Sequence, residues 1–502
     1  MRQSEYIRHD AIALAELVRS GSVSAIELLE TALAQLETVN PTINAVVHSM
    51  EADARHDATR LADGPFAGVP FLAKDLGSMY AGHPTTSGSR LLHGVPVTWD
   101  SELARRVRAT GVMVFGKTNT PEWGLLPVTE PELWGPARNP WDTERTPGGS
   151  SGGAGAAIAA GVVPMAGAGD GGGSIRIPAS CCGLFGLKPT RGRTPTGPNR
   201  GQMWRGATVE HVITRSVRDS AAMLDATHGP DPGVMFEIPP PSGPWLREVD
   251  QPPGRLRVAW TTIPAVDTEV DPECVEAVHR TAELLEELGH EVHEDHVPID
   301  GLQFAKDFLT IVTGELGTDV REACVATGRR ASLDTLEPTT LALALLSEAL
   351  SARDFAEALR SLEVMARGVG DFFERYDIVM TPTLSRRPVP IGTIGPTPAE
   401  RFQLKLLGRI GSGRVIRWAG LIDEAAKSTL DFVPWTPIYN VTGHPAMSVP
   451  LHTSEDGLPV GIHLVGRFAR EDVLLRLAGQ LERARPWFDT MSTMATGGTT
   501  SP

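Results

Sequence analysis

Short apolar runs alternate with helix-start signals along much of this sequence, and that alternation restricts its fold more than any other feature. An apolar run occupies 68–73, and a helix expected over 101–110 precedes a second run at 112–115. A helix over 152–160 is followed directly by a third run at 162–168. Alternation of this kind is typical of a sheet with helices packed against it. We therefore predict an α/β fold whose central, mixed, twisted β-sheet is covered by helices on both faces.

Capping residues place some helix boundaries. Ser24 and Glu27 form a capping box at the start of an N-terminal helix, which Pro41 is expected to end. Asp271 and Pro272 suit the N-cap and the first position of a later helix. These signals predict one helix near the N-terminus and another inside the core.

The chain has 502 residues, enough for a large buried core. Beyond residue 300 the pattern becomes helix-rich, although a strand is expected at 377–380. We interpret this part as an insertion that forms a lid or a pocket wall. We predict one catalytic domain over 1–488, followed by a disordered tail: N-terminal helices (1–60), a core (65–300), a helical insertion (300–425), a return to the core (426–488) and the tail (489–502).

The charge balance argues against two classes of partner. Lys and Arg number 46 against 61 Asp and Glu, which gives a net charge of −15 at pH 7. Nucleic acids and anionic membrane surfaces bind basic patches, so we expect neither as a partner. The four cysteines show no metal-binding or disulfide spacing, and the N-terminus lacks the apolar core of a signal peptide. We therefore expect a cytoplasmic protein without a metal or another cofactor.

Two serines embedded in glycines mark the candidate catalytic region. Ser150 lies in the segment GGSSGG at 148–153, and Ser174 follows three glycines. Glycine permits unusual backbone angles and the close approach of a ligand. Consecutive backbone N–H groups suit an oxyanion hole, and the candidates are Gly171, Gly172, Gly173 and Ser174. A serine nucleophile also needs a base, and no histidine lies in this stretch.

Three other motif matches lack the context that they need. The pattern Gly-x-Ser-x-Gly at 148–152 matches a nucleophile elbow, but a loop at 139–147 precedes it in place of a strand. The glycines of 167–172 match a dinucleotide fingerprint, but no Gly-rich helix start follows them. The histidines of 290–296 fit an alternating strand with a solvated polar face better than a metal site.

Several ordered segments resemble the amidase signature family. Besides GGSSGG, they are GVPFLAKD at 68–75, GKTN at 116–119, GGSIRIPA at 172–179, GLKPTRGR at 186–193 and NVTGHPA at 440–446. Together they span most of the chain. The resemblance implies the amidase-signature fold, in which a homodimer is common.

The resemblance also implies a Ser–Ser–Lys triad that hydrolyses a carboxamide through an acyl-enzyme. Ser174 is then the nucleophile, Ser150 relays its proton from a cis peptide, and Lys74 is the base. A lysine base must be neutral, and burial next to the apolar run at 69–73 would lower its pKa from about 10.4.

Further residues are expected to support this site. Asp170 and Arg176 suit a buried ion pair that braces the oxyanion loop, and Ser151 is expected to have a structural or supporting role. The sequence departs from the family pattern at one position, because Gly169 stands before Asp170 where the family usually has Thr. This departure leaves the geometry beside the oxyanion loop open.

Segments at 116–122 and 129–141 resemble the branch of the family that contains 6-aminohexanoate-cyclic-dimer hydrolase. The resemblance implies activity on linear or cyclic amides with apolar linkers. We expect a broad-specificity hydrolase of aryl or alkyl amides, with carbamates (urethanes), esters and nylon-type oligomers left open as small-molecule substrates. The candidate pocket residues are Trp123, Met203 and Trp204. Two alternatives remain: a glutaminase subunit of a tRNA-dependent amidotransferase, and a non-catalytic binding protein on the same fold.

Overall fold

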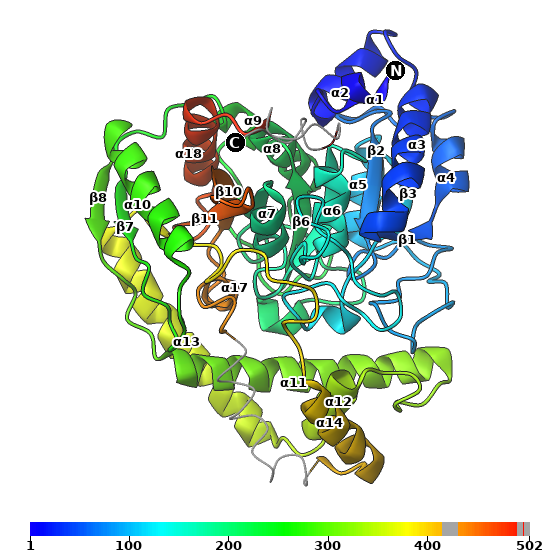
Figure 1. The fold of residues 1–502 in the computed structure, drawn as a ribbon, viewed down its shortest axis with the longest axis vertical. Helices are drawn as coiled ribbons and strands as arrows, with labels where there is room; N and C mark the ends of the chain where they lie inside the picture. Colours follow the sequence, from blue (N-terminus) through cyan, green and yellow to red (C-terminus); the bar gives the residue numbers. More distant parts are fainter. Residues whose placement is uncertain (414–429, 489–494, 496–502) are drawn as a thin grey trace.

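The strands form one eleven-stranded sheet in the described part of this computed structural model, which covers residues 1–413, 430–488 and 495. The order across the sheet is β1 (Val46–Ser49), β3 (Met113–Thr118), β2 (Pro70–Lys74), β4 (Met165–Asp170), β6 (Val209–Thr214), β5 (Phe185–Lys188), β10 (Ala446–Thr453), β11 (Pro459–Gly466), β9 (Ile378–Pro382), β7 (Arg257–Trp260) and β8 (Glu291–Glu294) (Figure 1). β2, β3 and β4 are parallel, as are β7, β8 and β9, and the remaining pairs are antiparallel. The sheet is therefore mixed, as predicted.

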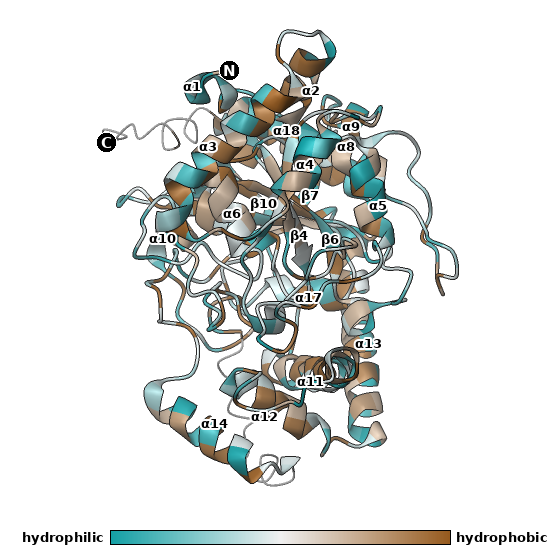
Figure 2. Cartoon of the chain, turned by 90° about the vertical axis from the view of Figure 1, so that its right-hand side faces the viewer, coloured by the Kyte–Doolittle hydropathy of each residue, from teal (hydrophilic) through white to brown (hydrophobic). Residues whose placement is uncertain are grey.

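Helices cover both faces of the sheet (Figures 1 and 2). One face carries α6 (Gly152–Ala159) and α7 (Arg176–Cys182), and the other carries α5 (Glu102–Ala109), α8 (Val217–Thr227) and α18 (Glu471–Ala484). Two glycines of β11 illustrate the division: Gly461 lies against Ser180 of α7, and Gly466 lies against Leu474 of α18. Among the described helices, none offers the stretch of apolar surface that a bilayer crossing requires.

Further helices lie outside these two groups. They are α1 (Gln3–Tyr6), α2 (Ala11–Arg19), α3 (Ala25–Ile43), α4 (Glu51–Asp57), α9 (Trp245–Glu248), α10 (Pro272–Glu287) and α17 (Thr436–Val441). The capping signals placed helix starts correctly, since Ser24 caps α3 and Asp271 caps α10. The prediction that Pro41 ends its helix was wrong. Pro41 lies inside the last turn of α3, so the helix loses only the one hydrogen bond that an N–H at position 41 would donate, and it continues to the left-handed Asn44 that ends it.

A separate group of helices fills the part of the chain predicted as an insertion, at the bottom of Figure 1. It contains α11 (Gly301–Thr327), α12 (Pro338–Ser347) and α14 (Pro398–Ile410), while α13 (Ala352–Arg375) leads back to the sheet at β9. Phe304 and Phe308 of α11 are buried against the sheet side, and Leu316 and Val320 are buried toward α12. The tail expected at 489–502 lies outside the described residues, apart from residue 495.

The three motif matches that lacked their usual sequence context also lack it in the structure. Residues 139–147 form turns and isolated bridges instead of a strand. The glycines of 167–172 belong largely to β4 and the loop after it. β8 contains most of the histidine segment, where His290 contacts Gln480 at 2.8 Å and His293 contacts Glu291 at 3.0 Å. These two histidines therefore bind different side chains.

α6 approaches neighbouring backbone closely because it consists almost entirely of small residues. Each of its residues is buried. A Cβ atom on Gly153 would lie 2.4 Å from the backbone nitrogen of Asn119 and 2.5 Å from the carbonyl oxygen of Ala45. Glycine at position 153 is therefore required by contact with backbone, which cannot rotate away as a side chain can.

Gly153→Ala and Gly370→Ala are expected to change stability in opposite directions. Both glycines are helical, so alanine improves helix propensity by about 1 kcal/mol at each position. The new methyl at 153 meets backbone, at an overpacking cost of about 1–3 kcal/mol or more. The one at 370 has no atom within 4 Å. Urea unfolding should give a lower free energy of unfolding for Gly153→Ala only, and equal stability of the two variants would contradict the close approach.

Candidate active site

Lys74 and Ser150 meet at the end of β2. Lys74 is the last residue of this strand, and its Nζ donates a hydrogen bond to Ser150 Oγ at 2.8 Å. Each residue is only 3% exposed. Burial lowers the pKa of Lys74 to about 7, although the charges of Glu210 and Asp170 oppose this shift. A substantial fraction of Lys74 is therefore neutral near pH 7, which a general base requires.

The loop that carries Ser150 is held on both sides by Thr129. The Thr129 hydroxyl donates to the Gly148 carbonyl at 2.9 Å and accepts from the Gly152 N–H at 3.1 Å. The peptide bond between Gly149 and Ser150 is cis. Thr129 was not among the predicted site residues, because its role depends on contacts that are distant in sequence.

Ser151 supports the same loop from the other side. It precedes α6, but its side chain does not cap that helix. Its hydroxyl instead lies 3.3 Å from both the nitrogen and the carbonyl oxygen of Gly169 in β4. Ser151 therefore connects the loop of Ser150 to the strand that leads to Ser174.

Ser174 lies on the short loop between β4 and α7. It is 9% exposed, which makes it the most accessible of the three predicted triad residues. The loop of Ser150 packs against both elements that flank Ser174. Ser151 contacts β4, and a Cβ on Gly148 would lie 3.0 Å from Ile177 of α7.

The backbone before Ser174 has N–H groups available for an oxyanion. The Gly173 N–H donates to Asp170 Oδ1 at 2.7 Å, so this expected donor is already engaged. The N–H groups of Gly171, Gly172 and Ser174 have no hydrogen-bond acceptor within the described residues. These three groups, and not the Gly173 N–H, are free to bind a ligand oxygen.

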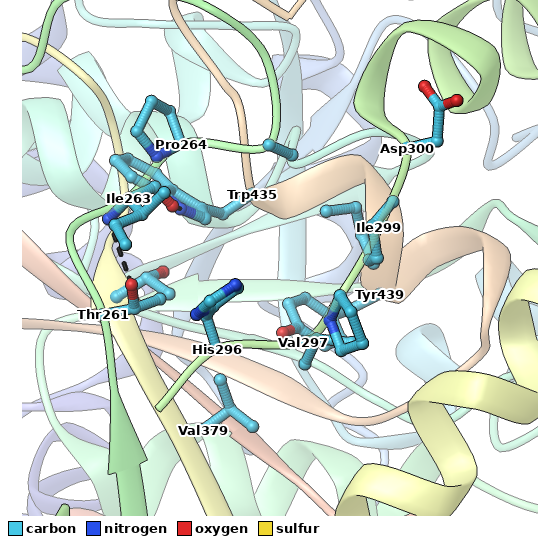
Figure 3. A pocket seen from close by; sticks show the side chains of 14 residues that line it. Thr261, Ile263, Pro264, His296, Val297, Ile299, Asp300, Val379, Trp435 and Tyr439 are labelled. Atoms are coloured by element: carbon cyan, nitrogen blue, oxygen red, sulfur yellow. Dashed lines mark hydrogen bonds between the residues drawn. The ribbon is translucent and has the colours of Figure 1, made fainter. Parts of the chain in front are cut away.

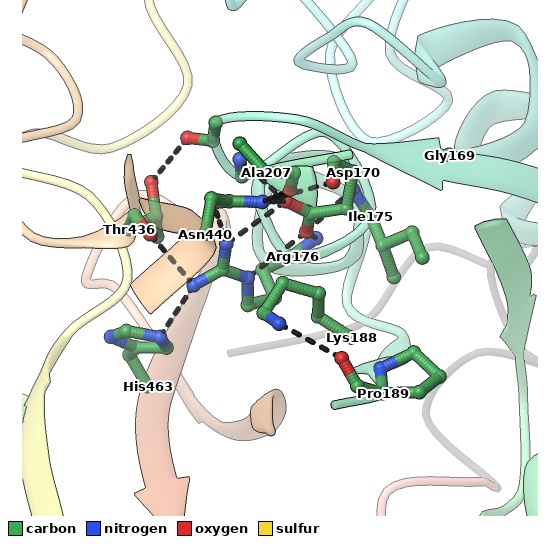
Figure 4. Close-up of polar contacts among 12 residues, drawn as sticks. Gly169, Asp170, Ile175, Arg176, Lys188, Pro189, Ala207, Thr436, Asn440 and His463 are labelled. Atoms are coloured by element: carbon green, nitrogen blue, oxygen red, sulfur yellow. Dashed lines mark hydrogen bonds and ion pairs between the residues drawn. The ribbon is translucent and has the colours of Figure 1, made fainter. Parts of the chain in front are cut away.

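A buried ion pair holds the loop around Ser174. Arg176 Nε and Nη2 donate to the two oxygens of Asp170 at 3.0 and 2.9 Å, and both side chains are fully buried (Figure 4). The same carboxylate accepts the N–H groups of Gly173 and Ile175. Although burial opposes it, the Arg176 guanidinium holds the pKa of Asp170 well below its usual range. The carboxylate therefore stays ionised and orders the loop.

Residues from α17 and β11 complete this network, and the sequence did not identify them. Asn440 Nδ2 donates to Asp170 Oδ1 at 2.8 Å, and Asn440 Oδ1 accepts from Arg176 Nη2 at 2.6 Å. His463 Nε2 lies 2.9 Å from Arg176 Nη1. Burial lowers the pKa of His463 well below its usual range, so this neutral nitrogen accepts the bond. Asn440 begins a family-like segment, which is the signal that identifies it in retrospect.

Trp204 and Phe308 flank the loop before Ser174. A Cβ on Gly171 would lie 3.0 Å from the Trp204 ring, and one on Gly172 would lie 3.7 Å from the Phe308 ring. The two rings meet edge to face, with their centroids 6.3 Å apart. Trp204, one of the predicted pocket residues, thus lies beside the loop before Ser174, and Phe308 of α11 lies next to it.

The other two predicted pocket residues, Trp123 and Met203, are connected to the site through neighbouring residues. Trp123 packs against the apolar cluster of α11 and α12, and it precedes Gly124, where a Cβ would lie 3.2 Å from Ser150 Oγ. Met203 starts the 3₁₀ turn Met203–Gly206, which also contains Trp204. The structure therefore connects Trp123 to the site through Gly124, and Met203 to the site through the turn that it shares with Trp204.

A separate cavity of about 460 Å³ lies beside α17 (Figure 3). Ile438, Tyr439 and residues 296–300 line it, whereas Lys74, Ser150 and Ser174 do not. Thr436 of the same helix donates instead to the Gly172 carbonyl at 2.8 Å. α17 therefore separates this cavity from the nucleophile loop, and we do not assign the substrate to it.

Comparison with known proteins agrees with this geometry. A sequence profile of the Amidase family matches residues 27–475. The chain belongs to the Amidase family. This membership confirms the predicted family and makes the protein an enzyme, an amidase of the hydrolase class.

Its relatives include other hydrolases over their full length. A 6-aminohexanoate-cyclic-dimer hydrolase from Pseudomonas sp. (strain NK87) is 40% identical over 485 residues, which cover 95% of each chain. A solved 6-aminohexanoate cyclic dimer hydrolase superposes with a TM-score of 0.88 at 38% identity, over 96% of this chain and 98% of that one. A bacterial aryl acylamidase of the amidase signature family superposes with a TM-score of 0.84 at 26% identity, over 98% and 99% of the two chains. The predicted mixed α/β amidase fold is confirmed.

Arg176→Met is expected to destabilise this amidase more at pH 7 than at pH 5. In the wild type, the folded-state pKa of Asp170 lies below its unfolded value, so its stabilising contribution is present above about pH 4 and is lost as the pH falls. Without Arg176, burial raises the pKa of Asp170. Folding at pH 7 then costs about 3–5 kcal/mol for an unpaired buried charge, and protonation at pH 5 relieves part of that cost.

Urea unfolding at both pH values measures this difference. The control is Arg353→Met, which removes an exposed pair with Glu357 on α13 and should change the free energy of unfolding by at most about 0.5 kcal/mol. A loss for Arg176→Met that is the same at both pH values would contradict an ionised Asp170 in this ion pair.

Proposed function

We propose that this amidase hydrolyses carboxamides with Ser174 as nucleophile, Ser150 as proton relay and Lys74 as general base. The observation that carries the proposal is the buried hydrogen bond of 2.8 Å between Lys74 and Ser150. The packing of the Ser150 loop against β4 and α7 supports a relay from Ser174, because these two elements flank the nucleophile loop. A lysine with a pKa of about 7 matches the requirement for a base at neutral pH.

In the proposed reaction, neutral Lys74 accepts the Ser150 proton while Ser150 accepts the proton of Ser174. Ser174 Oγ bonds to the amide carbon, and the carbonyl oxygen becomes an oxyanion. We assign its stabilisation to the free N–H groups of Gly171, Gly172 and Ser174. The proton then returns through Ser150 to the leaving amine as the C–N bond breaks. Water attacks the acyl-enzyme by the same proton route and releases the acid.

We propose aryl and alkyl amides with apolar groups as substrates. Trp204 and Phe308 support this choice, because they place an apolar wall beside the nucleophile loop. The relatives named for a cyclic amide dimer and for aryl acylamides support it as well. Carbamates and esters pass through the same tetrahedral chemistry, so they belong to the proposed range together with nylon-type oligomers.

The purified chain is expected to release nitroaniline from an acyl p-nitroanilide. Ser174→Ala should lower kcat by at least about 10³-fold, because the nucleophile is lost. Ser22→Ala, an exposed substitution after α2, serves as the matched control and should keep full activity. A p-nitrophenyl ester, an aryl carbamate, a cyclic 6-aminohexanoate dimer and glutamine complete the panel.

The panel also separates the alternatives. Turnover of glutamine alone would favour a glutaminase subunit, and binding without turnover of any substrate would favour a non-catalytic protein. Full hydrolysis by Ser174→Ala would overturn the proposed mechanism.

The value of kcat/KM is expected to rise with pH through about 7. Lys74 accepts a proton only when it is neutral, and its pKa is about 7, so activity is lost as the pH falls below that value. Lys74→Arg should be inactive at every pH between about 5 and 9, because arginine stays protonated throughout. A flat wild-type profile over this range would contradict Lys74 as the base.

A further inference from the structure

A buried carboxyl group outside the proposed triad lies near Lys74. Glu210 is the second residue of β6, is 8% exposed, and accepts a hydrogen bond from Ser78 Oγ at 3.3 Å. Glu210 and Lys74 line the same cavity of about 20 Å³. Apolar side chains form most of its lining, and Ser78, Tyr80 and His211 add polar groups beside Lys74 and Glu210. The volume is enough for one water molecule, which could bridge Lys74 and Glu210, since the two do not form a direct ion pair.

Two glycines make room for this carboxyl group. Gly169 is paired directly with Glu210 across β4 and β6, so side chains at these positions share one face of the sheet. A Cβ on Gly169 would lie 3.5 Å from Glu210 Cγ, and a branched threonine would extend further into that space. A Cβ on Gly77 would lie 2.0 Å from Glu210 Oε1. The departure from the family pattern at Gly169 and the buried glutamate are therefore parts of one arrangement.

Lys74 carries the positive charge that lowers the pKa of Glu210. Burial raises the pKa of Glu210 to about 7, and the charge of Lys74 opposes that rise. Tyr80 and His211 line the same cavity. Burial raises the pKa of Tyr80 above its usual range and lowers that of His211 to about 3, so both are neutral at pH 7. The charge of Asp170 also raises the pKa of Lys74, but the Asp170 carboxylate is paired with Arg176.

We propose that Glu210 is a positioning residue that stabilises the ammonium form of Lys74 when the base accepts the serine proton. Its role resembles that of the acid in a Ser–His–Asp triad, where a buried carboxylate stabilises the protonated base. The proposal rests on the proposed role of Lys74. No further bond forms or breaks: the proton from the serines ends on Lys74, and the carboxylate form of Glu210 is the form that stabilises the resulting ammonium.

Glu210→Gln tests the proposal, because it keeps the shape and an acceptor for Ser78 but removes the charge. The Glu210 charge raises the pKa of Lys74, so its loss should move the acid limb of the kcat/KM profile to lower pH by up to about one unit. The plateau should fall by about threefold to tenfold, since the ammonium is less stabilised. A purely structural role would not move the acid limb.

Glu482→Gln is the matched control. Glu482 is also a glutamate whose pKa burial raises to about 7, but it caps the start of α8 by accepting the Val217 N–H. This variant should leave the acid limb in place. Gly169→Thr is the second test variant, because the added side chain competes with Glu210 for space. It should reproduce the shift of Glu210→Gln, and its profile decides the question if Glu210→Gln does not fold.

The outcomes distinguish this proposal from the proposed function. If Lys74→Met and Ser174→Ala retain activity, the triad itself is overturned. If those variants are inactive but Glu210→Gln and Gly169→Thr keep the wild-type acid limb and plateau, only the role of Glu210 is overturned. A shift of the acid limb to lower pH in both, with none in Glu482→Gln, supports it.

Discussion

The ion pair between Asp170 and Arg176 joins the parts of the chain that surround Ser174. Both residues come from one short segment, yet Asn440 of α17 and His463 of β11 satisfy their remaining hydrogen-bonding groups. Buried charges are tolerated only when they are paired and hydrogen-bonded, so these contacts are coupled. The conformation of the loop between β4 and α7, and the direction of its free N–H groups, therefore depend on side chains from the C-terminal part of the chain.

Two buried ionisable groups in this site differ in their charge state. Asp170 touches Arg176 directly, and its pKa falls although burial favours the neutral acid. Lys74 forms its hydrogen bond with Ser150, and the carboxylates of Glu210 and Asp170 are not in direct contact with it. Burial therefore lowers its pKa to about 7. One interior thus keeps an acid ionised and a lysine partly neutral, because the distance to the counter-charge differs. Glu210 also affects the pKa of Lys74, because its carboxyl group lines the same cavity as Lys74.

Glycine and the helical insertion shape the space around these groups. Gly153 lets α6 reach the backbone of Asn119, and the Ser150 loop directly precedes this helix. On the other side, Phe308 of α11 meets Trp204 next to the nucleophile loop. The small residues of α6 are compatible with a close approach of backbone, whereas Phe308 of α11 adds apolar surface beside the loop before Ser174.

The amino-acid sequence by itself determined the α/β class, the capped helix starts at Ser24 and Asp271, and the candidates Ser150 and Ser174. These features depend on local spacing, and local spacing is what a sequence displays. Tertiary structure alone decided the eleven-strand order, the engagement of the Gly173 N–H by Asp170, and the arrival of Asn440 at the ion pair. It also decided that a helix continues past Pro41 to the left-handed Asn44, at the loss of one helical hydrogen bond. The strand order and the contacts of Gly173 and Asn440 depend on atoms that are brought together only by folding. The continuation past Pro41 depends on the turn of the helix in which the proline lies. Residue type alone sets neither of these.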